Sequence, residues 1–373
     1  MRRLTPHRHD DTLNLVLDGY SILQAGVLKM YKAVLVGTGG WAAAHAEAYL
    51  ICENIQLAGI CGHSNMDRLK EMAHRYDIPD YSLDLRSLLL ATQPDILDVS
   101  ANPHFRLQAV QEAVRHESIK LINLEKPMAL MPEDAYEIAE LCKRYNKLLT
   151  INHQKKFLPA WQKAYSLIAS GALGELRHIR ATCRGNVLEQ GTHLLDMALH
   201  FNQYEPIEWV MGQIGALDGL DKEGASAPDE AAAVLHARNG VRIYMECGAV
   251  GRTISAKDNK WLQFSLEAYG TEGHLNIGLN QTLAFTRYAD GSTHVEESSW
   301  DLHYRDAQAR HLRSLADYIQ NPAAGHISDL ERSLSSFEIV MAIYASGVQS
   351  GRIALPRKFS NQLMEEMSAK RTN

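Results

Sequence analysis

A glycine-rich turn between a strand-like run and a helical pattern constrains this chain most. Residues 32–36 form a short apolar run typical of a β-strand, and residues 42–51 have a helical pattern. The turn between them reads Gly37-Thr38-Gly39-Gly40-Trp41-Ala42, a GxGxxA motif. In this position the first glycine permits a tight turn, the second lets a pyrophosphate approach the backbone, and the alanine lets helix and strand pack closely. The motif predicts a dinucleotide site at the start of this helix; the alternative is a glycine turn without a ligand.

Strand-like runs and helical patterns keep alternating as far as residue 152. The runs cover residues 55–61, 96–100, 120–124 and 148–152, and the helical patterns cover residues 66–76, 105–116 and 132–145. Such alternation predicts a parallel sheet covered by helices. We therefore expect a Rossmann dinucleotide-binding domain over residues 30–152.

The pattern changes in the second half of the chain. Alternating runs typical of antiparallel strands cover residues 177–184, 231–237, 241–247 and 263–269, and long helical patterns at residues 307–319 and 330–350 follow them. A length of 373 residues also suits two hydrophobic cores better than one. We predict an α/β chain in which residues 153–373 form an α+β domain with an open, mainly antiparallel sheet.

Composition excludes several classes of protein. A net charge of -6 without a block of Lys or Arg offers no electrostatic footprint for nucleic acid. The five cysteines are odd in number and form no CxxC pair, so they predict neither a disulfide framework nor a zinc site, and the histidines are scattered, so we expect no metal. Free cysteines fit the reducing cytoplasm. No apolar run reaches the roughly 18 to 20 residues that would span a membrane.

Residues 1–29 form a leader without a recognisable targeting pattern. Asp18 interrupts its apolar stretch, so it lacks the apolar core of a signal peptide. Because Met30 directly precedes the first strand, we expect translation to begin there and the leader to be dispensable. The alternative is an extra packed helix.

The position that selects between NAD and NADP follows the second strand. An acidic residue about 20 residues beyond the glycine turn holds the ribose 2′-hydroxyl of NAD in such domains. Gly62 stands there, and His63, Ser64 and Arg68 offer room, a hydroxyl and positive charge for a 2′-phosphate. We therefore predict NAD(P) as cofactor with a modest preference for NADP. The alternative is a plain turn and helix cap.

A second motif follows the strand at residues 120–124. Glu125-Lys126-Pro127 places a lysine at the carboxyl edge of a parallel sheet, where such folds bind ligands. With the glycine turn and the antiparallel second half, the chain resembles the glucose–fructose oxidoreductase/inositol dehydrogenase family, written Gfo/Idh/MocA, over residues 30–356. Residues 189–196 (EQGTHLLD) are similar to that family's second motif, and residues 269–273 and 345–356 are less specific echoes.

The resemblance implies an NAD(P)-dependent oxidoreductase. It would transfer a hydride between the nicotinamide and a carbinol or carbonyl of a sugar, polyol, inositol or related small molecule. The resemblance makes Lys126, Glu189 and His193 the catalytic residues: His193 suits proton transfer, Lys126 would stabilise a developing alkoxide, and Glu189 would orient or polarise His193. Family members often carry aspartate where Glu189 stands. Asp196 is expected to be a cap or a packing partner instead.

The motifs and the resemblance together assign the remaining contacts. Cofactor contacts are expected from Gly37, Thr38, Gly39, Gly40, Trp41, Gly62, His63, Ser64, Arg68, Ser100, Ala101, Asn102, His104, Glu125, Lys126 and Pro127. Substrate contacts are expected from Lys126, Gln154, Lys156, Glu189, Thr192 and His193, with Lys156 in place of the family's arginine.

The family also implies a homodimer or homotetramer joined through the open sheet of residues 153–373, because an amphipathic sheet face needs cover. Two other functions stay open on the same fold. One is a glycosidase-like enzyme that uses bound NAD transiently, and the other is a nucleotide-sensing regulator without catalysis.

Overall fold

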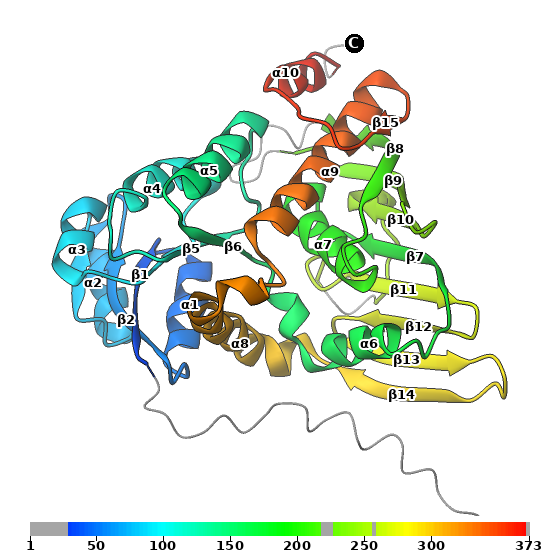
Figure 1. Ribbon diagram of the computed structural model, residues 1–373, viewed down its shortest axis with the longest axis horizontal. Coiled ribbons are helices and arrows are strands. Elements are labelled where there is room, and N and C mark those ends of the chain that lie inside the picture. Colours follow the sequence, from blue (N-terminus) through cyan, green and yellow to red (C-terminus); the bar gives the residue numbers. More distant parts are fainter. Residues whose placement is uncertain (1–28, 218–226, 256–258, 371–373) are drawn as a thin grey trace, which may run out of the picture.

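The computed structural model describes residues 29–217, 227–255 and 259–370. Two β-sheets lie beside each other, and helices pack on both (Figure 1). The first half of the chain forms a six-stranded sheet and the second half a nine-stranded one. This arrangement confirms the predicted Rossmann domain followed by an α+β domain. The predicted leader lies, as far as residue 28, outside the described residues.

The six-stranded sheet is parallel throughout. In spatial order its strands are β3 (Asp80–Ser82), β2 (Ile55–Cys61), β1 (Tyr31–Val36), β4 (Ile96–Val99), β5 (Leu121–Glu125) and β6 (Leu148–Asn152). Its helices are α1 (Gly40–Tyr49), α2 (Met66–Arg75), α3 (Leu85–Thr92), α4 (Arg106–Ala113) and α5 (Pro132–Arg144). The strand order reverses between β1 and β4. The carboxyl ends of these two strands therefore border the crevice in which such sheets bind ligands.

The sequence pattern does not predict β3 or α3. β3 has only three residues, too few to display a period of two. α3 begins after Asp84, whose carboxylate accepts hydrogen bonds from the amides of Arg86 and Ser87 as an N-cap does. This cap fixes the start of α3 next to the carboxyl end of β2, because β3 pairs with β2.

The nine-stranded sheet is antiparallel except where β10 pairs with β7. In spatial order its strands are β14 (Thr293–Ser298), β13 (Gln281–Arg287), β12 (Gly273–Gly278), β11 (Phe264–Gly270), β7 (Leu176–Cys183), β10 (Arg242–Cys247), β9 (Glu230–Ala237), β8 (Ile207–Gly215) and β15 (Ile353–Ala354). Buried and more exposed residues alternate along β9 and β10. One face of the sheet is therefore apolar and needs a covering layer.

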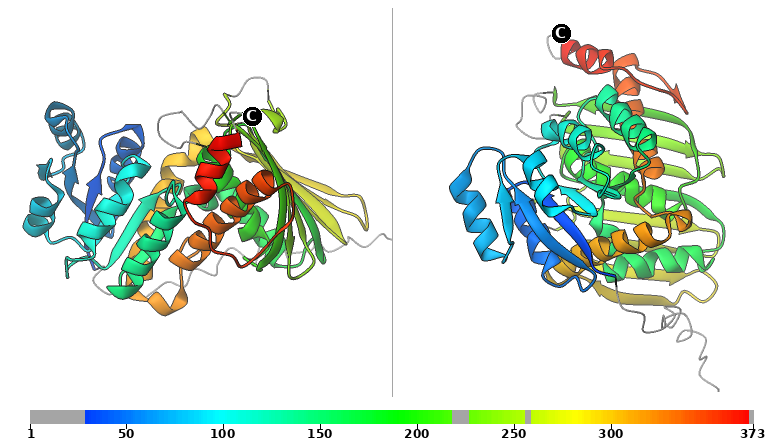
Figure 2. Two further views of the ribbon diagram at one scale, coloured as in Figure 1. Left: turned by 90° about the horizontal axis from the view of Figure 1, so that it is seen from above. Right: turned by 60° about the vertical axis from the view of Figure 1, so that its left-hand side comes forward.

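Helices cover one face of this sheet and leave the other open, as Figure 2 shows. The covering helices are α6 (Pro159–Ala169), α7 (Thr192–Phe201) and α9 (Leu330–Gln349), and the short α10 (Gln362–Ala369) packs against α9. α7 is buried along its whole length. None of the helices in the described ranges is long and apolar enough to cross a membrane.

Helix α8 (Trp300–Gln320) comes from the second half of the chain but packs on the first sheet. Its residues Ala309, Leu312 and Leu315 share a buried apolar cluster with Tyr31 and Ile96 of the Rossmann strands. α8 lies alongside α1 in Figure 1. The sequence predicts the helix, but nothing local in its pattern indicates that it returns to the nucleotide-binding sheet. The two halves are thus joined through a shared layer, as well as through the chain after β6.

Candidate active site

A cleft of about 620 Å³ lies at the carboxyl ends of β1, β2 and β4. Its walls include half of the predicted cofactor contacts, namely Gly37, Thr38, Gly39, Gly62, His63, Ser100, Ala101 and Asn102. Gly37 has φ +128°, and a Cβ there would lie 2.9 Å from the Ser100 hydroxyl oxygen. Glycine is therefore required at this turn.

The start of α1 is built to receive an anion. Its N-cap is Gly39, which has no side chain to satisfy the amides of the first turn, and that turn holds no acidic residue. A Cβ on Gly39 would meet no atom within 4 Å, so the backbone there is open. Free amides and the positive end of a helix dipole together favour a phosphate group. These residues fit the pyrophosphate of a dinucleotide.

Some of the predicted cofactor contacts do not line this cleft. The Arg68 amide donates to the side-chain oxygen of Asn65, and the His104 amide donates to that of Asn102; both contacts cap helices. Neither Arg68 nor His104 lines the cleft, and Ser64 does not line it either. Gly40 instead begins α1. The cleft wall near Gly62 carries Asp84 and Arg86, which the sequence analysis missed because they belong to the unpredicted α3.

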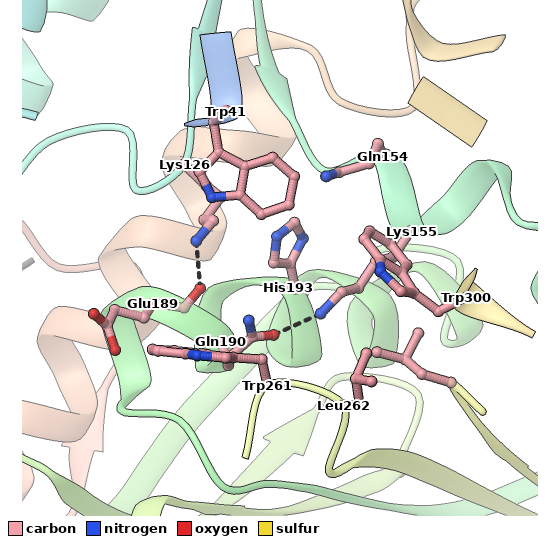
Figure 3. Close-up of a pocket in the computed structure, with 11 residues that line it drawn as sticks. Trp41, Lys126, Gln154, Lys155, Glu189, Gln190, His193, Trp261, Leu262 and Trp300 are labelled. Atoms are coloured by element: carbon pink, nitrogen blue, oxygen red, sulfur yellow. Dashed lines mark hydrogen bonds between the residues drawn. The ribbon is translucent and has the colours of Figure 1, made fainter. Parts of the chain in front are cut away.

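A second cavity of about 450 Å³ lies where the two halves meet (Figure 3). Trp41 of the glycine turn faces this cavity, so one motif borders both spaces. Of the predicted substrate contacts, Lys126, Gln154, Glu189 and His193 are present in its wall. The wall also holds residues that were not predicted, which are Lys155, Gln190, Trp261, Leu262, Leu279 and Trp300. Cavities of this size and polarity are typical of small-molecule sites.

Lys126 emerges from the end of β5 and contacts the second motif. Its Nζ donates to the main-chain carbonyl of Glu189 at 2.8 Å. Burial lowers the pKa of Lys126, and the charges of Glu125 and Glu189 oppose that shift. The Glu189 carboxylate points away from the His193 ring in Figure 3. The proposed orientation of His193 by Glu189 therefore has no hydrogen bond to support it among the described contacts.

A π turn at Val187–Gly191 carries the second motif into α7. The Asn186 side chain accepts hydrogen bonds from the amides of Leu188 and Glu189, at 3.0 and 2.8 Å, and so fixes the entry to the turn. A Cβ on Gly191 would lie 2.9 Å from the Cys247 sulfur, so glycine allows the turn to pack on β10. Single π turns within helices are frequent at functional sites.

His193 follows this turn and is almost fully buried. Burial lowers its pKa well below the ordinary value, and the positive charges of Lys155 and Lys126 lower it further. The ring is therefore neutral near pH 7. Its Nδ1 has no hydrogen-bond partner among the described residues. A neutral imidazole that lines a cavity can accept a proton from a hydroxyl group.

Lys155 and Lys156 are neighbours in the 3-10 turn Gln154–Phe157, but only Lys155 lines the cavity. Lys156 forms an ion pair with Asp196 at 2.7 Å and donates to the carbonyl of Ile327 at 2.6 Å, outside the cavity. Lys156, which was expected to contact substrate, does not line this cavity, whereas its neighbour Lys155 does. Thr192 is likewise outside the cavity wall, since its hydroxyl donates to the Leu188 carbonyl.

The comparisons with known proteins agree with this geometry. A family model described as "Oxidoreductase family, NAD-binding Rossmann fold", GFO_IDH_MocA, matches residues 31–153. The match covers the nucleotide-binding sheet and its helices, about a third of this chain. D-glucoside 3-dehydrogenase of Escherichia coli (strain K12) is 22% identical in an alignment of length 363 that covers 87% of this chain and 97% of that protein. D-apiose dehydrogenase of Paraburkholderia graminis is 22% identical over 276 residues, 69% of this chain and 70% of that protein.

Solved structures share the fold of this chain along most of its length. Levoglucosan dehydrogenase in complex with NADH and L-sorbose superposes with a TM-score of 0.75 at 17% identity, covering 88% of this chain and 100% of that one. An oxidoreductase from Agrobacterium radiobacter in complex with NAD+, L-tartaric acid and magnesium gives 0.74 at 17% identity, covering 87% and 98%. The similarity thus extends beyond the nucleotide-binding half.

Glu125 is buried next to Lys126 of the cavity wall. Its carboxylate contacts the His45 Nε2 at 3.1 Å, and the His45 Nδ1 lies 2.7 Å from Asp98. Burial alone would lower the pKa of His45, but Asp98 and Glu125 outweigh it and raise the value to about 10. A buried imidazolium thus lies between two carboxylates. Glu125, which was predicted to contact the cofactor, is part of this network and directly precedes Lys126. Pro127, which was predicted to contact the cofactor as well, is buried.

No group of three or more His, Cys, Asp or Glu side chains in the described ranges is arranged to hold a metal ion.

Proposed function

We propose that this protein oxidises a secondary hydroxyl of a sugar, polyol, inositol or related small molecule with an NAD(P) cofactor, or reduces the matching carbonyl. The observation that carries the proposal is the convergence of Lys126 and a neutral His193 in one cavity whose wall includes Trp41 of the glycine turn. The relatives named above as dehydrogenases of a glucoside and of apiose support this substrate class.

In this proposal one side chain transfers the hydroxyl proton and another stabilises negative charge on the substrate oxygen. When bound, the nicotinamide supplies an acceptor or donor of hydride. His193 accepts the hydroxyl proton during oxidation and returns it during reduction. The Lys126 ammonium donates a hydrogen bond to the substrate oxygen and stabilises negative charge on it. Trp41, Trp261 and Trp300 offer apolar ring faces to the carbon side of a sugar and exclude water from the cavity.

The test is a panel of sugars, polyols and inositols assayed for net formation of NADH or NADPH. Lys126→Ala and His193→Ala should each lower turnover by about 10²-fold or more, while cofactor affinity changes little. Lys143→Ala, on the exposed part of α5, is the matched control. Near-parental rates for both cavity variants would refute the assignment. Turnover of a glycoside without net reduced cofactor would favour the glycosidase-like alternative, and binding without turnover would favour the regulator.

We also propose a modest preference for NADP. No carboxylate stands at Gly62, and Arg86 lines the cleft there. Asp84 is on the same wall, where its carboxylate accepts hydrogen bonds from the amides of Arg86 and Ser87. Gly62→Asp should shift preference toward NAD by about 1 to 3 kcal/mol. Gly62→Asn, equal in size and uncharged, is the control because a Cβ at Gly62 already approaches Leu83 to 3.2 Å. A parent that binds NAD more tightly would contradict the proposal.

The open face of the nine-stranded sheet supports a homodimer or homotetramer. Met211, Tyr244 and Val295 lie in one cross-strand row, and each is at least 40% exposed. A hollow of about 610 Å³ adjoins them on β8 to β10. Arg180, Glu267 and Asn276 lie between Tyr244 and Val295 in this row, so the face mixes polar residues with exposed apolar ones. Exposed apolar side chains of this kind are found at contacts between proteins. Light scattering should give a multiple of the chain mass, and Met211→Glu with Tyr244→Glu should reduce it; a monomeric parent would overturn this proposal.

All five cysteines are free thiols, which supports the reducing cytoplasm as the compartment.

A further inference from the structure

Lys155 is a buried cation whose contacts are neutral. Only 4% of the residue is exposed. Its Nζ donates to the amide oxygen of Gln190 at 2.6 Å and lies 4.0 Å from the ring centre of Phe264 and 5.8 Å from that of Trp300. None of the ion pairs found among the described residues includes Lys155. An aromatic face stabilises an ammonium only in part.

The two other lysines nearby, Lys156 and the partly buried Lys126, have acidic neighbours. Lys156 is paired with Asp196, and the charge of Lys126 is supported by Glu125 and Glu189. Lys155 lacks such support, because Glu189 is the only acidic residue among those described in the cavity wall, and Figure 3 places its carboxylate on the side of Lys126, away from Lys155. Burial and the charge of Lys126 accordingly lower the pKa of Lys155 to about 7.

A buried ammonium without a counterion is costly, so it loses its proton or acquires an anion. An anion that enters the cavity removes this cost and gains a charge-assisted hydrogen bond. The amide groups of Gln190 and Gln154 are also in the wall and can hydrogen-bond a second carboxylate oxygen or a neighbouring hydroxyl. A single free ammonium matches the single charge of a carboxylate better than the double charge of a phosphate.

We propose that the substrate is a polyhydroxylated carboxylic acid, such as an aldonate or a uronate, whose carboxylate pairs with Lys155 while a secondary hydroxyl lies against Lys126 and His193. The inference rests on the proposed function, since it names the substrate class of the same cavity. His193 lies between the two lysines in Figure 3. One molecule that spans the cavity can therefore reach the anion-binding end and the reacting end together.

The experiment compares acids with neutral amides of nearly the same shape. D-gluconate and D-galacturonate are paired with D-gluconamide and D-galacturonamide, and both cofactor-linked oxidation and binding by calorimetry are measured with the full chain and NAD(P) present. The parent should favour each acid over its amide by about tenfold or more. Lys155→Met should reduce this ratio to about threefold or less, and Lys155→Arg should retain most of it. Lys143→Met, which removes an exposed lysine on α5, should leave the ratio unchanged.

The outcomes separate this inference from the proposed function. Oxidation of neutral sugars with an acid-to-amide ratio near one would overturn the acid substrate and leave the dehydrogenase intact. An acid preference that Lys155→Met does not change would also overturn it. Acids that bind through Lys155 but give no reduced cofactor would support the anion subsite and contradict the proposed function. A sugar phosphate that is favoured over the carboxylates in a Lys155-dependent way would replace the carboxylate with a phosphate.

Discussion

The buried imidazolium of His45 makes a stability prediction whose size follows from the structure. His45 and Asp98 are fully buried, and Glu125 is 4% exposed. His45→Gln removes the cation and leaves two buried carboxylates facing an amide. Removing one partner from a buried ion pair costs about 3 to 5 kcal/mol. A pKa that rises from 6.5 to about 10 on folding corresponds to about 5 kcal/mol, which agrees with the upper end of that range.

The pH dependence of this loss has a definite sign. Because folding raises the pKa of His45, its contribution is fully present below the unfolded value of 6.5 and declines as the pH rises toward 10. The free energy of unfolding of the parent should exceed that of His45→Gln most at about pH 6.5. By about pH 9 the difference should have fallen by about 3 kcal/mol.

Denaturant titrations of both proteins, followed by circular dichroism at these two pH values, measure the difference directly. His74→Gln replaces a solvent-exposed histidine on α2 and is the control, for which we expect less than about 0.5 kcal/mol at either pH. A loss below about 1 kcal/mol for His45→Gln, or a loss that does not depend on pH, would show that His45 is not a cation between the two carboxylates.

Four further predictions concern the two cavities and the ion pair between Lys156 and Asp196. Gly37→Ala should weaken cofactor binding by about tenfold or more in fluorescence titrations, because its Cβ would press on Ser100 in a backbone conformation that alanine avoids; unchanged affinity would contradict the close approach. Lys156→Met should lower the free energy of unfolding by about 3 kcal/mol or more, since Asp196 would be left buried without its cation. Because the pKa of His193 lies well below its ordinary value, turnover should persist in acid past pH 6.5 before it declines, and a decline centred near that pH would point to a different base. Trp41→Ala should raise the KM for substrate more than the dissociation constant of the cofactor, because the indole lines the substrate cavity and not the nucleotide cleft.

The parts of the site that could be predicted from the sequence are those encoded locally. The glycine turn and the Glu125-Lys126-Pro127 segment each lie at the end of a strand, so their place at the carboxyl edge of a parallel sheet can be inferred from the strand pattern alone. His193 lies in a motif that a family resemblance could locate. The structure places the glycine turn in the wall of the nucleotide cleft, and Lys126 and His193 in the wall of the second cavity.

The parts that could not be predicted depend on orientation or on distant packing. Lys155 and Lys156 are neighbours of the same type, and only the geometry of a 3-10 turn decides which one enters the cavity. Trp261 and Trp300 come from distant segments, and neither stands in a motif. The cleft wall near Gly62 includes residues at the start of α3, and this short helix has no periodic sequence pattern that would predict it.

The return of α8 to the first sheet decides how this protein can be divided. A fragment cut after Asn152 would keep every strand of the nucleotide-binding sheet but lose the helix that covers Tyr31, Ile55 and Leu121. That fragment would expose apolar core to water and should aggregate when produced alone. Exchanging the nucleotide-binding half between relatives as a contiguous cassette would pack these core residues against the α8 of another protein, whose side chains did not evolve to fit them. A successful chimera has to carry residues 300–320 with the half that they cover, although they lie far along the chain from it.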